Sequence, residues 1–200
     1  NRRGEPIDTF RRLRVQARQI YSVCEMGRLG YSGPWREVVA NAVDHLVSKG
    51  INSEGRFIHK FDSHGAVLDD RADLYDQAFG LFALAHAGHA LQRQELFEHG
   101  LKLRDVLESR WQRPEGGFWE GEITPCPPYR QNPHMHLLEA ALAHYSFTGN
   151  QRWRIFAEKI ANLFKTRFQH PSGAVTEYFD RNWIPLSSAE GDIVEPGHCL

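Results

Sequence analysis

The sequence predicts an all-α fold built from helical hairpins that repeat about every sixty residues. Two kinds of helix alternate along the chain, one amphipathic and one apolar on nearly every side. Three landmarks give the period: Tyr75 and His136 are 136 − 75 = 61 residues apart, and His136 and His198 are 198 − 136 = 62 apart. Each unit therefore consists of an inner helix, a tight turn, an outer helix and a long loop.

Three segments have the pattern of a helix that buries one face. Apolar residues recur at spacings of three and four, and charged residues occupy the opposite side, so each helix covers a core with one face. These outer helices are predicted around Trp35, Val38, Val39, Ala42, Leu46 and Val47, around Leu96, Phe97, Gly100, Leu103 and Leu107, and around Trp153, Phe156, Ala157, Ile160, Ala161 and Phe164.

The inner helices are predicted from segments that lack a polar face. Residues 78–85 and 137–143 are apolar nearly all round, which is typical of helices buried on most sides. Segment 8–26 is more polar, but its place in the repeat predicts the first inner helix. Gly-rich aromatic stretches predict irregular loops or short hairpins between outer and inner helices. They lie near Gly55, Gly116 and Ser172.

Helical hairpins either stack as an open solenoid or close into a barrel, and inner helices that are apolar all round favour closure. The inner helices are expected to run in one direction, so that their N-termini and the preceding loops meet at one rim. Asn132 before Pro133 predicts an N-cap and a first-turn proline there. Gly149 and Asn150 predict a helix end followed directly by a helix start.

Composition narrows the class of protein. The net charge is −1, with acids and bases interspersed, and this predicts neither nucleic-acid nor membrane binding. Apolar runs are too short for a transmembrane helix. Three cysteines (Cys24, Cys126 and Cys199) lie far apart without a CxxC pair. We therefore expect no zinc or disulfide framework, and a reducing cytoplasm.

Four motifs, one near each inner helix, resemble those of the N-acylglucosamine 2-epimerase family in order and spacing. They are Arg14-Val-Gln-Ala-Arg18-Gln-Ile-Tyr21, Asp73-Leu-Tyr75-Asp-Gln-Ala-Phe79, Asn132-Pro-His-Met-His136-Leu-Leu-Glu139-Ala and Glu195-Pro-Gly-His198. Each motif is weakly specific by itself, whereas four in register are strongly specific. The resemblance covers essentially all 200 residues.

The resemblance implies an (α/α)6 barrel of roughly twice this length, of which residues 1–200 would be the N-terminal half. It also implies an enzyme that epimerises or isomerises a free sugar at C1 or C2, such as an N-acylhexosamine, cellobiose or mannose. We expect a small-molecule sugar as partner, a homodimer, and neither a cofactor nor a metal. The second acid/base histidine of the family would lie beyond this chain.

The resemblance also implies residue roles. His198 would be one of two acid/base histidines, and His136, with Asn132, would hold the reducing-end ring and assist its opening. Arg18 and Tyr75 would contact sugar hydroxyls. A neutral histidine suits removal of the C2 proton from an open-chain aldose, because its ordinary pKa lies near working pH. The product would be a cis-enediolate, whose oxygen Arg18 and helix N-termini could stabilise.

Each candidate also has a structural interpretation. His198 could cap a helix, His136 could be a core histidine, and Arg18 could be a buried ion-pair partner. Tyr75 could pack against a loop carbonyl. Trp119, on a rim loop, could stack on a sugar or belong to the core. A metal site formed by His134 and His136 is not expected, because a spacing of two residues points them to different sides of a helix.

Two other functions remain open from the residues alone. A glycoside hydrolase or lyase on an α/α barrel would need two carboxylates flanking a cleft, roughly 5–9.5 Å apart. The shared landmarks are instead His, Arg, Tyr and Asn, which disfavours hydrolysis. The available carboxylates are Glu139, Glu177, Glu190, Asp192 and Glu195. A non-catalytic, partner-binding member of the family is the other alternative, because a fold alone does not give a function.

Overall fold

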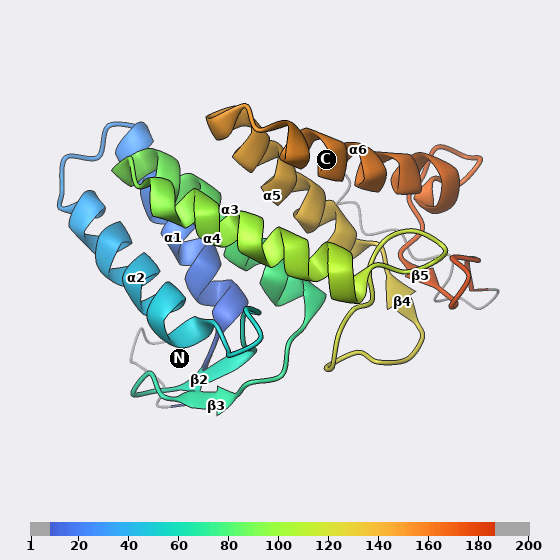
Figure 1. The fold of residues 1–200 in the computed structure, drawn as a ribbon, viewed down its shortest axis with the longest axis horizontal. Helices are drawn as coiled ribbons and strands as arrows, with labels where there is room; N and C mark the ends of the chain where they lie inside the picture. The colour runs from blue at the N-terminus through green and yellow to red at the C-terminus, as the bar shows by residue number, and fades with distance from the viewer. Residues whose placement is uncertain (1–8, 187–200) are drawn as a thin grey trace.

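A computed structural model describes residues 9–186. Within this range six α-helices form three consecutive hairpins, as Figure 1 shows. The hairpins are α1 (Leu13–Arg28) with α2 (Trp35–Gly50), α3 (Leu74–Leu91) with α4 (Gln94–Val106), and α5 (Asn132–Thr148) with α6 (Gln151–Leu163). The predicted all-α architecture, with its alternation of two helix kinds, is therefore confirmed.

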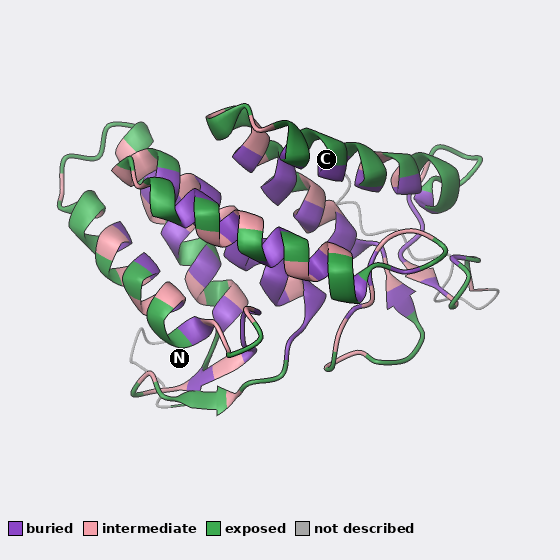
Figure 2. Cartoon of the chain, in the orientation of Figure 1, coloured by how far each residue is buried: buried purple, intermediate pink, exposed green. Residues whose placement is uncertain are grey.

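The helices lie in two layers. The inner helix α3 packs between the inner helices α1 and α5, and α2, α4 and α6 each pack behind their own inner partner. Figure 2 shows how α6 buries the side that faces α5 and exposes its outer side. The main core fills the space between the layers, and small residues such as Ala78, Ala83 and Ala87 are fully buried there. Their short side chains allow the inner helices to approach closely.

Short antiparallel strands tie distant loops together. The Gly-rich stretches themselves are short turns, each closed by a single antiparallel bridge (Ile51–Phe57, Gln112–Phe118 and Gln169–Val175), as predicted. One sheet has the order β1 (Phe10–Arg12), β2 (Lys60–Asp62) and β3 (Val67–Asp69), and a second pairs β4 (Tyr129–Arg130) with β5 (Tyr178–Phe179). The predicted start of the first inner helix at residue 8 was wrong, because Phe10, Arg11 and Arg12 pair with β2 as a strand. The helix begins at Leu13.

Two helix ends test the capping predictions. Gly149 adopts the left-handed backbone conformation that ends α5, and the Asn150 side chain accepts a hydrogen bond from the Arg152 backbone, as predicted. The N-cap prediction for Asn132 was wrong. Asn132 is the first residue of α5, because Gln131 before it already has helical backbone angles and accepts hydrogen bonds from the next turn.

A second, smaller core lies beneath the loops that follow α4 and α6. These helices end in the wider turns η1 (Leu107–Trp111) and η2 (Phe164–Phe168), which bury Trp111 in the main core and Phe168 in the small one. The small core also contains Tyr129, Leu163, Val175, Phe179 and Trp183. It fixes the loops at the end of the molecule where α5 begins.

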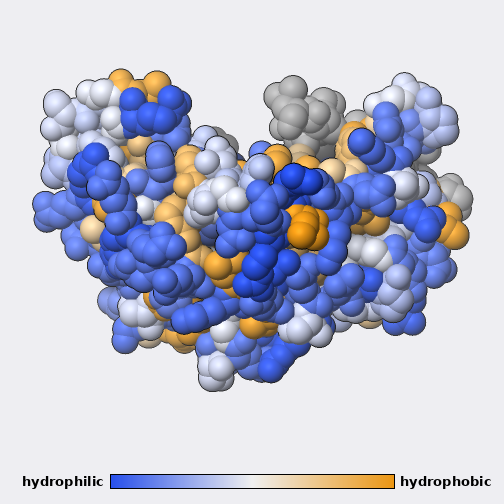
Figure 3. Space-filling model, turned by 45° about the horizontal axis from the view of Figure 1, so that its top comes forward, coloured by the Kyte–Doolittle hydropathy of each residue, from blue (hydrophilic) through white to orange (hydrophobic). Residues whose placement is uncertain are grey.

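The arc of hairpins has two apolar edges. At one edge Val15 on α1 and Val38 on α2 are exposed, and a groove of about 1010 Å³ runs between these helices. At the other edge Leu142 on α5 and Ile155 on α6 are exposed. Figure 3 shows the outline of the molecule notched between two raised ends. Within residues 9–186, no helix has the length and apolarity needed to cross a membrane.

Candidate active site

One face of α3 is partly open to solvent, although most of the helix is buried. Tyr75, Phe82 and His86 are partly exposed, whereas the residues between them lie in the core. The spacings of seven and four place the three side chains on one side of the helix. This face looks away from the outer layer, and the inner helices on either side contribute neighbouring side chains to it.

Near the starts of α3 and α5, five side chains from the three inner helices form a group that we call the rim cluster. It consists of Arg18, Tyr75, Phe79, His136 and Glu139. The Tyr75 hydroxyl lies 3.3 Å from His136 Nε2, and the two rings meet edge to face with centroids 5.1 Å apart. Phe79 packs against His136 at 4.5 Å, and the Arg18 guanidinium lies 5.2 Å from the Phe79 ring centre.

Glu139 completes the rim cluster. Its Oε2 lies 2.6 Å from His136 Nδ1, one turn away on the same helix. His136 therefore has a carboxylate at one ring nitrogen and the Tyr75 phenol at the other. The His136 side chain is 12% exposed and that of Glu139 is 48% exposed, so the imidazole is shielded while the carboxylate reaches water.

A buried ion-pair network supports Tyr75 from below. Arg14 Nε lies 2.8 Å from Asp76 Oδ1, its Nη2 lies 3.3 Å from Asp73 Oδ2, and its guanidinium covers the Tyr75 ring at 4.6 Å. Asp73 also accepts a hydrogen bond from the Tyr75 backbone and caps α3. Arg14 therefore fixes both the start of α3 and the ring plane of Tyr75.

The electrostatics of this network follow from its burial. Burial would lower the pKa of Arg14, but the hydrogen bond and charge of Asp76, together with Asp73, raise it. Burial raises the pKa of Asp73, and the attraction of Arg14 opposes that rise. A guanidinium held between two carboxylates stays charged, and its positive charge compensates the cost of burying them.

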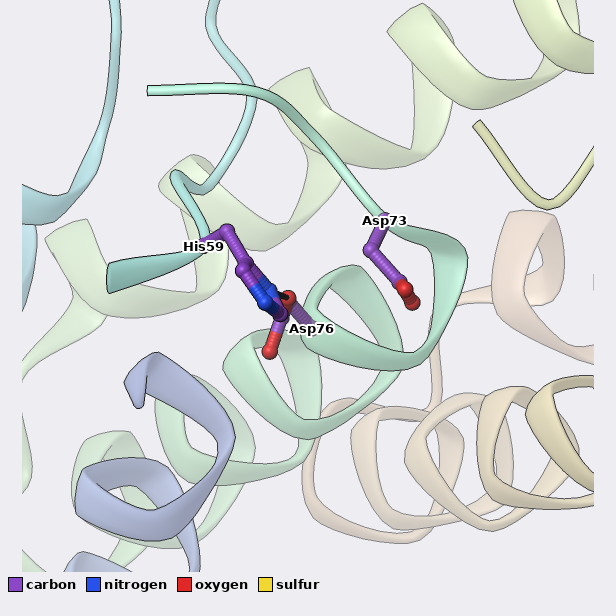
Figure 4. A group of neighbouring side chains, drawn as sticks. All are labelled: His59, Asp73 and Asp76. Carbon is purple, nitrogen blue, oxygen red and sulfur yellow. Dashed lines mark hydrogen bonds and ion pairs between the residues drawn. The ribbon is translucent and has the colours of Figure 1, made fainter. Parts of the chain in front are cut away.

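His59, Asp73 and Asp76 offer ligand atoms within 4.8 Å of one another, which suggests a metal site at first sight. Figure 4 shows His59 directed at Asp76, with Asp73 at the start of the helix. His59 Nδ1 lies 2.6 Å from Asp76 Oδ2. Arg14 already supplies a positive charge to both carboxylates at hydrogen-bonding distance, so we interpret the group as an ion-pair network rather than a metal centre.

The structure brings Arg18, Tyr75 and His136 together, as the motifs predicted. Arg18 is exposed and stacks on Phe79, so its interpretation as a buried ion-pair residue is wrong, and Arg14 has that position instead. Asn132 is 9% exposed, and its Oδ1 is buried without a hydrogen-bond partner among the described residues. His198 lies outside the described residues.

Trp119 packs against the small core beneath the loops and does not belong to the rim cluster. It is partly buried, its ring lies 5.8 Å from that of Tyr129, and the guanidinium of Arg113 covers it at 4.6 Å. His134 and His136 also separate as expected. His134 is fully buried, accepts a hydrogen bond from the Phe118 backbone, and has its pKa lowered to about 3 by burial.

Sequence reasoning assigned no role to Arg14 or Phe79, and it considered Glu139 only as one of the carboxylates available to a hydrolase. All three stand inside the quoted motifs, and their spacings carry a signal: Arg14 lies four residues before Arg18, and Glu139 three residues after His136. On a helix, such spacings put side chains on one face. The partners, however, come from other helices, and only the fold shows which residue of each pair is buried.

With this geometry in place, comparison with known proteins identifies the family. The sequence matches the profile of N-acylglucosamine 2-epimerase (GlcNAc 2-epimerase) over residues 1–200. The chain belongs to the N-acylglucosamine 2-epimerase family. It is 39% identical over 98% of its length to a mannose-6-phosphate isomerase of Rhizobium meliloti (strain 1021), and 34% identical over 66% to a D-mannose isomerase of Thermobifida fusca.

Solved structures support the fold. A cellobiose 2-epimerase from Spirochaeta thermophila matches 90% of the chain with a TM-score of 0.81 and 23% identity, and it is an (α/α)6 barrel. An unsaturated glucuronyl hydrolase from Bacillus sp. GL1 matches 88% with a TM-score of 0.71 and 13% identity, which shows the fold alone. The chain spans 52% of the mannose-6-phosphate isomerase and 49% of the cellobiose 2-epimerase, about half of each.

Proposed function

We propose that the protein containing this chain interconverts sugars at C1 and C2 through ring opening and a cis-enediolate, with histidine acid/base catalysis. The carrying observation is the rim cluster. It presents His136 Nε2 beside the Tyr75 hydroxyl, with the Arg18 guanidinium on the same group of rings. A base, a hydroxyl and a cation together are what an enediolate reaction requires.

The residues divide the work as follows. His136 accepts a proton from the anomeric hydroxyl as the ring opens. The Tyr75 hydroxyl accepts or donates a hydrogen bond at the neighbouring oxygen of the sugar. Arg18 stabilises negative charge that develops on the substrate. Asn132, whose buried Oδ1 has no partner among the described residues, would accept a hydrogen bond from a sugar hydroxyl. His198 would exchange the proton at C2.

The names of the relatives define the substrates to test. Mannose and mannose 6-phosphate follow from the two isomerases, and cellobiose from the 2-epimerases. All three sugars carry a free reducing end, which ring opening requires. Choice among them depends on loops around the rim, since loops vary more than the helices that position them.

Two described carboxylates near the rim are poorly placed for hydrolysis. Glu120 is buried, and its Oε2 lies 2.7 Å from Arg130 Nε. Glu177 is buried and accepts a hydrogen bond from the Gln131 amide at 2.8 Å. A hydrolase requires one carboxylic acid and one free carboxylate across a cleft, so these pairings favour the isomerase over the hydrolase.

The test uses the full-length protein in heavy water. Mannose, mannose 6-phosphate, glucose, fructose, cellobiose and N-acetylmannosamine are incubated separately, and NMR follows products and deuterium at C2. Conversion of one sugar with deuterium entering at C2 is the expected result. A folded protein that converts none of them and exchanges no C2 proton would refute the proposal and leave the partner-binding alternative.

A further inference from the structure

Three side chains, those of Glu139, Tyr75 and Phe79, contact the ring of His136. Glu139 Oε2 lies 2.6 Å from Nδ1, the Tyr75 hydroxyl 3.3 Å from Nε2, and the Phe79 ring packs at 4.5 Å. In a neutral imidazole only one nitrogen carries the proton. A carboxylate can only accept a hydrogen bond, so it selects the form protonated on Nδ1.

We propose that Glu139 is a positioning residue for His136, which keeps the proton on Nδ1 and leaves the Nε2 lone pair facing Tyr75. This inference rests on the proposed function, in which Nε2 is the base. The arrangement has the same logic as a buried carboxylate that orients a catalytic histidine in other enzymes. Glu139 never touches the substrate in this scheme.

The contact differs from an ordinary surface pair. Arg154 and Glu158 on α6 also form an ion pair one turn apart, at 2.9 Å, but their side chains are 55% and 60% exposed. The imidazole of His136, by contrast, is 12% exposed and touches rings from another helix. Rotation of that ring would break its contacts with Tyr75 and Phe79, so its orientation has a functional consequence.

The proton balance is simple. When the sugar ring opens, the O–H bond of the anomeric hydroxyl breaks, an Nε2–H bond forms, C1 becomes a carbonyl carbon, and the C1–O5 electron pair leaves with the ring oxygen. His136 becomes an imidazolium, and the ionised Glu139 stabilises it without accepting the proton. Transfer of this proton from Nε2 to the ring oxygen then forms O5–H, completes the neutral open-chain sugar and restores the neutral imidazole.

The experiment compares full-length wild type with Glu139→Gln and with Glu158→Gln as a matched control. Glutamine keeps the size of the side chain but can donate its amide to Nδ1, which favours the opposite tautomer. With ¹⁵N-labelled histidine, long-range ¹H–¹⁵N spectra at pH 8.5 report which ring nitrogen of His136 carries the proton, and His136→Asn assigns the signal. The steady-state kcat and KM are measured on the same samples.

We expect Glu139→Gln to move the His136 proton from Nδ1 towards Nε2 and to lower kcat by about 10-fold, with KM within about twofold. Glu158→Gln leaves both unchanged. An unchanged tautomer in Glu139→Gln overturns the inference, and so does a shifted tautomer with wild-type kcat. If wild type turns over no sugar, the proposed function has failed, while the tautomer comparison still decides whether Glu139 sets the ring.

Discussion

Replacement of Arg14 by methionine is expected to destabilise the fold by about 3 kcal/mol at pH 7. Methionine keeps most of the aliphatic stem but leaves Asp73 and Asp76 buried without their cation. Breaking a buried ion pair from one side costs about 3–5 kcal/mol, and the 17% exposure of the Arg14 side chain places this case at the low end.

The loss depends on pH in a defined direction. The pKa of Asp73 is raised from 3.8, so the protonated form of this group is favoured by folding. Its contribution to stability is present below 3.8 and is lost as pH rises through the folded pKa. Without Arg14 that pKa rises further, so the deficit of the variant is largest near pH 7 and shrinks towards pH 4.5.

Urea unfolding of the full-length protein at pH 7 and pH 4.5, followed by tryptophan fluorescence, measures the effect. Arg154→Met is the control, because Arg154 makes a comparable contact with Glu158 on the exposed side of α6. The control should leave the free energy of unfolding nearly unchanged. Equal losses in the two variants, or a deficit of Arg14→Met that grows on acidification, would refute the reasoning.

Three further perturbations test other parts of the structure. Tyr75→Phe keeps the ring contact with His136 but removes the hydroxyl, so kcat should fall about 10-fold with little change in Tm, and a wild-type kcat would contradict this. Gly117→Ala places a methyl 2.7 Å from a packed side chain at φ 73°, and should lower the free energy of unfolding by about 1–2 kcal/mol more than Gly173→Ala, where nothing lies within 4 Å. Burial lowers the pKa of His144 to about 3, so protonation of this histidine favours the unfolded state below pH 6.5. His144→Phe should therefore reduce the stability lost between pH 7 and pH 5 by about 2 kcal/mol, as urea titrations at both values would show.

The helices could be predicted because their signals are local. Spacings of three and four residues located the outer helices, and the absence of a polar face in residues 78–85 and 137–143 marked the inner ones. The first inner helix was misplaced at its start. Residues 10–12 become a strand only because β2 lies beside them, and this pairing partner is some fifty residues away in the sequence.

The candidate site was only partly predictable. The motifs located Tyr75 and His136, because the repeat places both at the starts of inner helices. They singled out Arg18 but gave no sign that Arg14 is the buried ion-pair residue, since both lie on one face of α1 and only contacts with α3 bury Arg14. Trp119 shows the same limit: its loop position gave no sign that Arg113 covers its ring.

Several predictions stay untested, because residues 9–186 of a single chain do not bear on them. They are the role of His198, the closure of residues 1–200 into a complete barrel by a second half, the cytoplasmic location, a homodimer, and catalysis without a cofactor. The apolar edges of the arc, at α1 with α2 and at α5 with α6, are where further hairpins would pack in a barrel. Size-exclusion chromatography of the full-length protein measures the oligomeric state.

The rate of C2 proton exchange in the His136→Asn variant, compared with the rate in wild type, tests the proposed role of the rim cluster most directly. The full-length wild type and variant are incubated in heavy water with the sugar that the wild type converts, and NMR follows deuterium at C2. If His136 opens the ring, exchange should fall at least about 100-fold in a variant with unchanged Tm, because C2 becomes acidic only in the open chain. Exchange at the wild-type rate in that variant would contradict the assignment of His136 as the base.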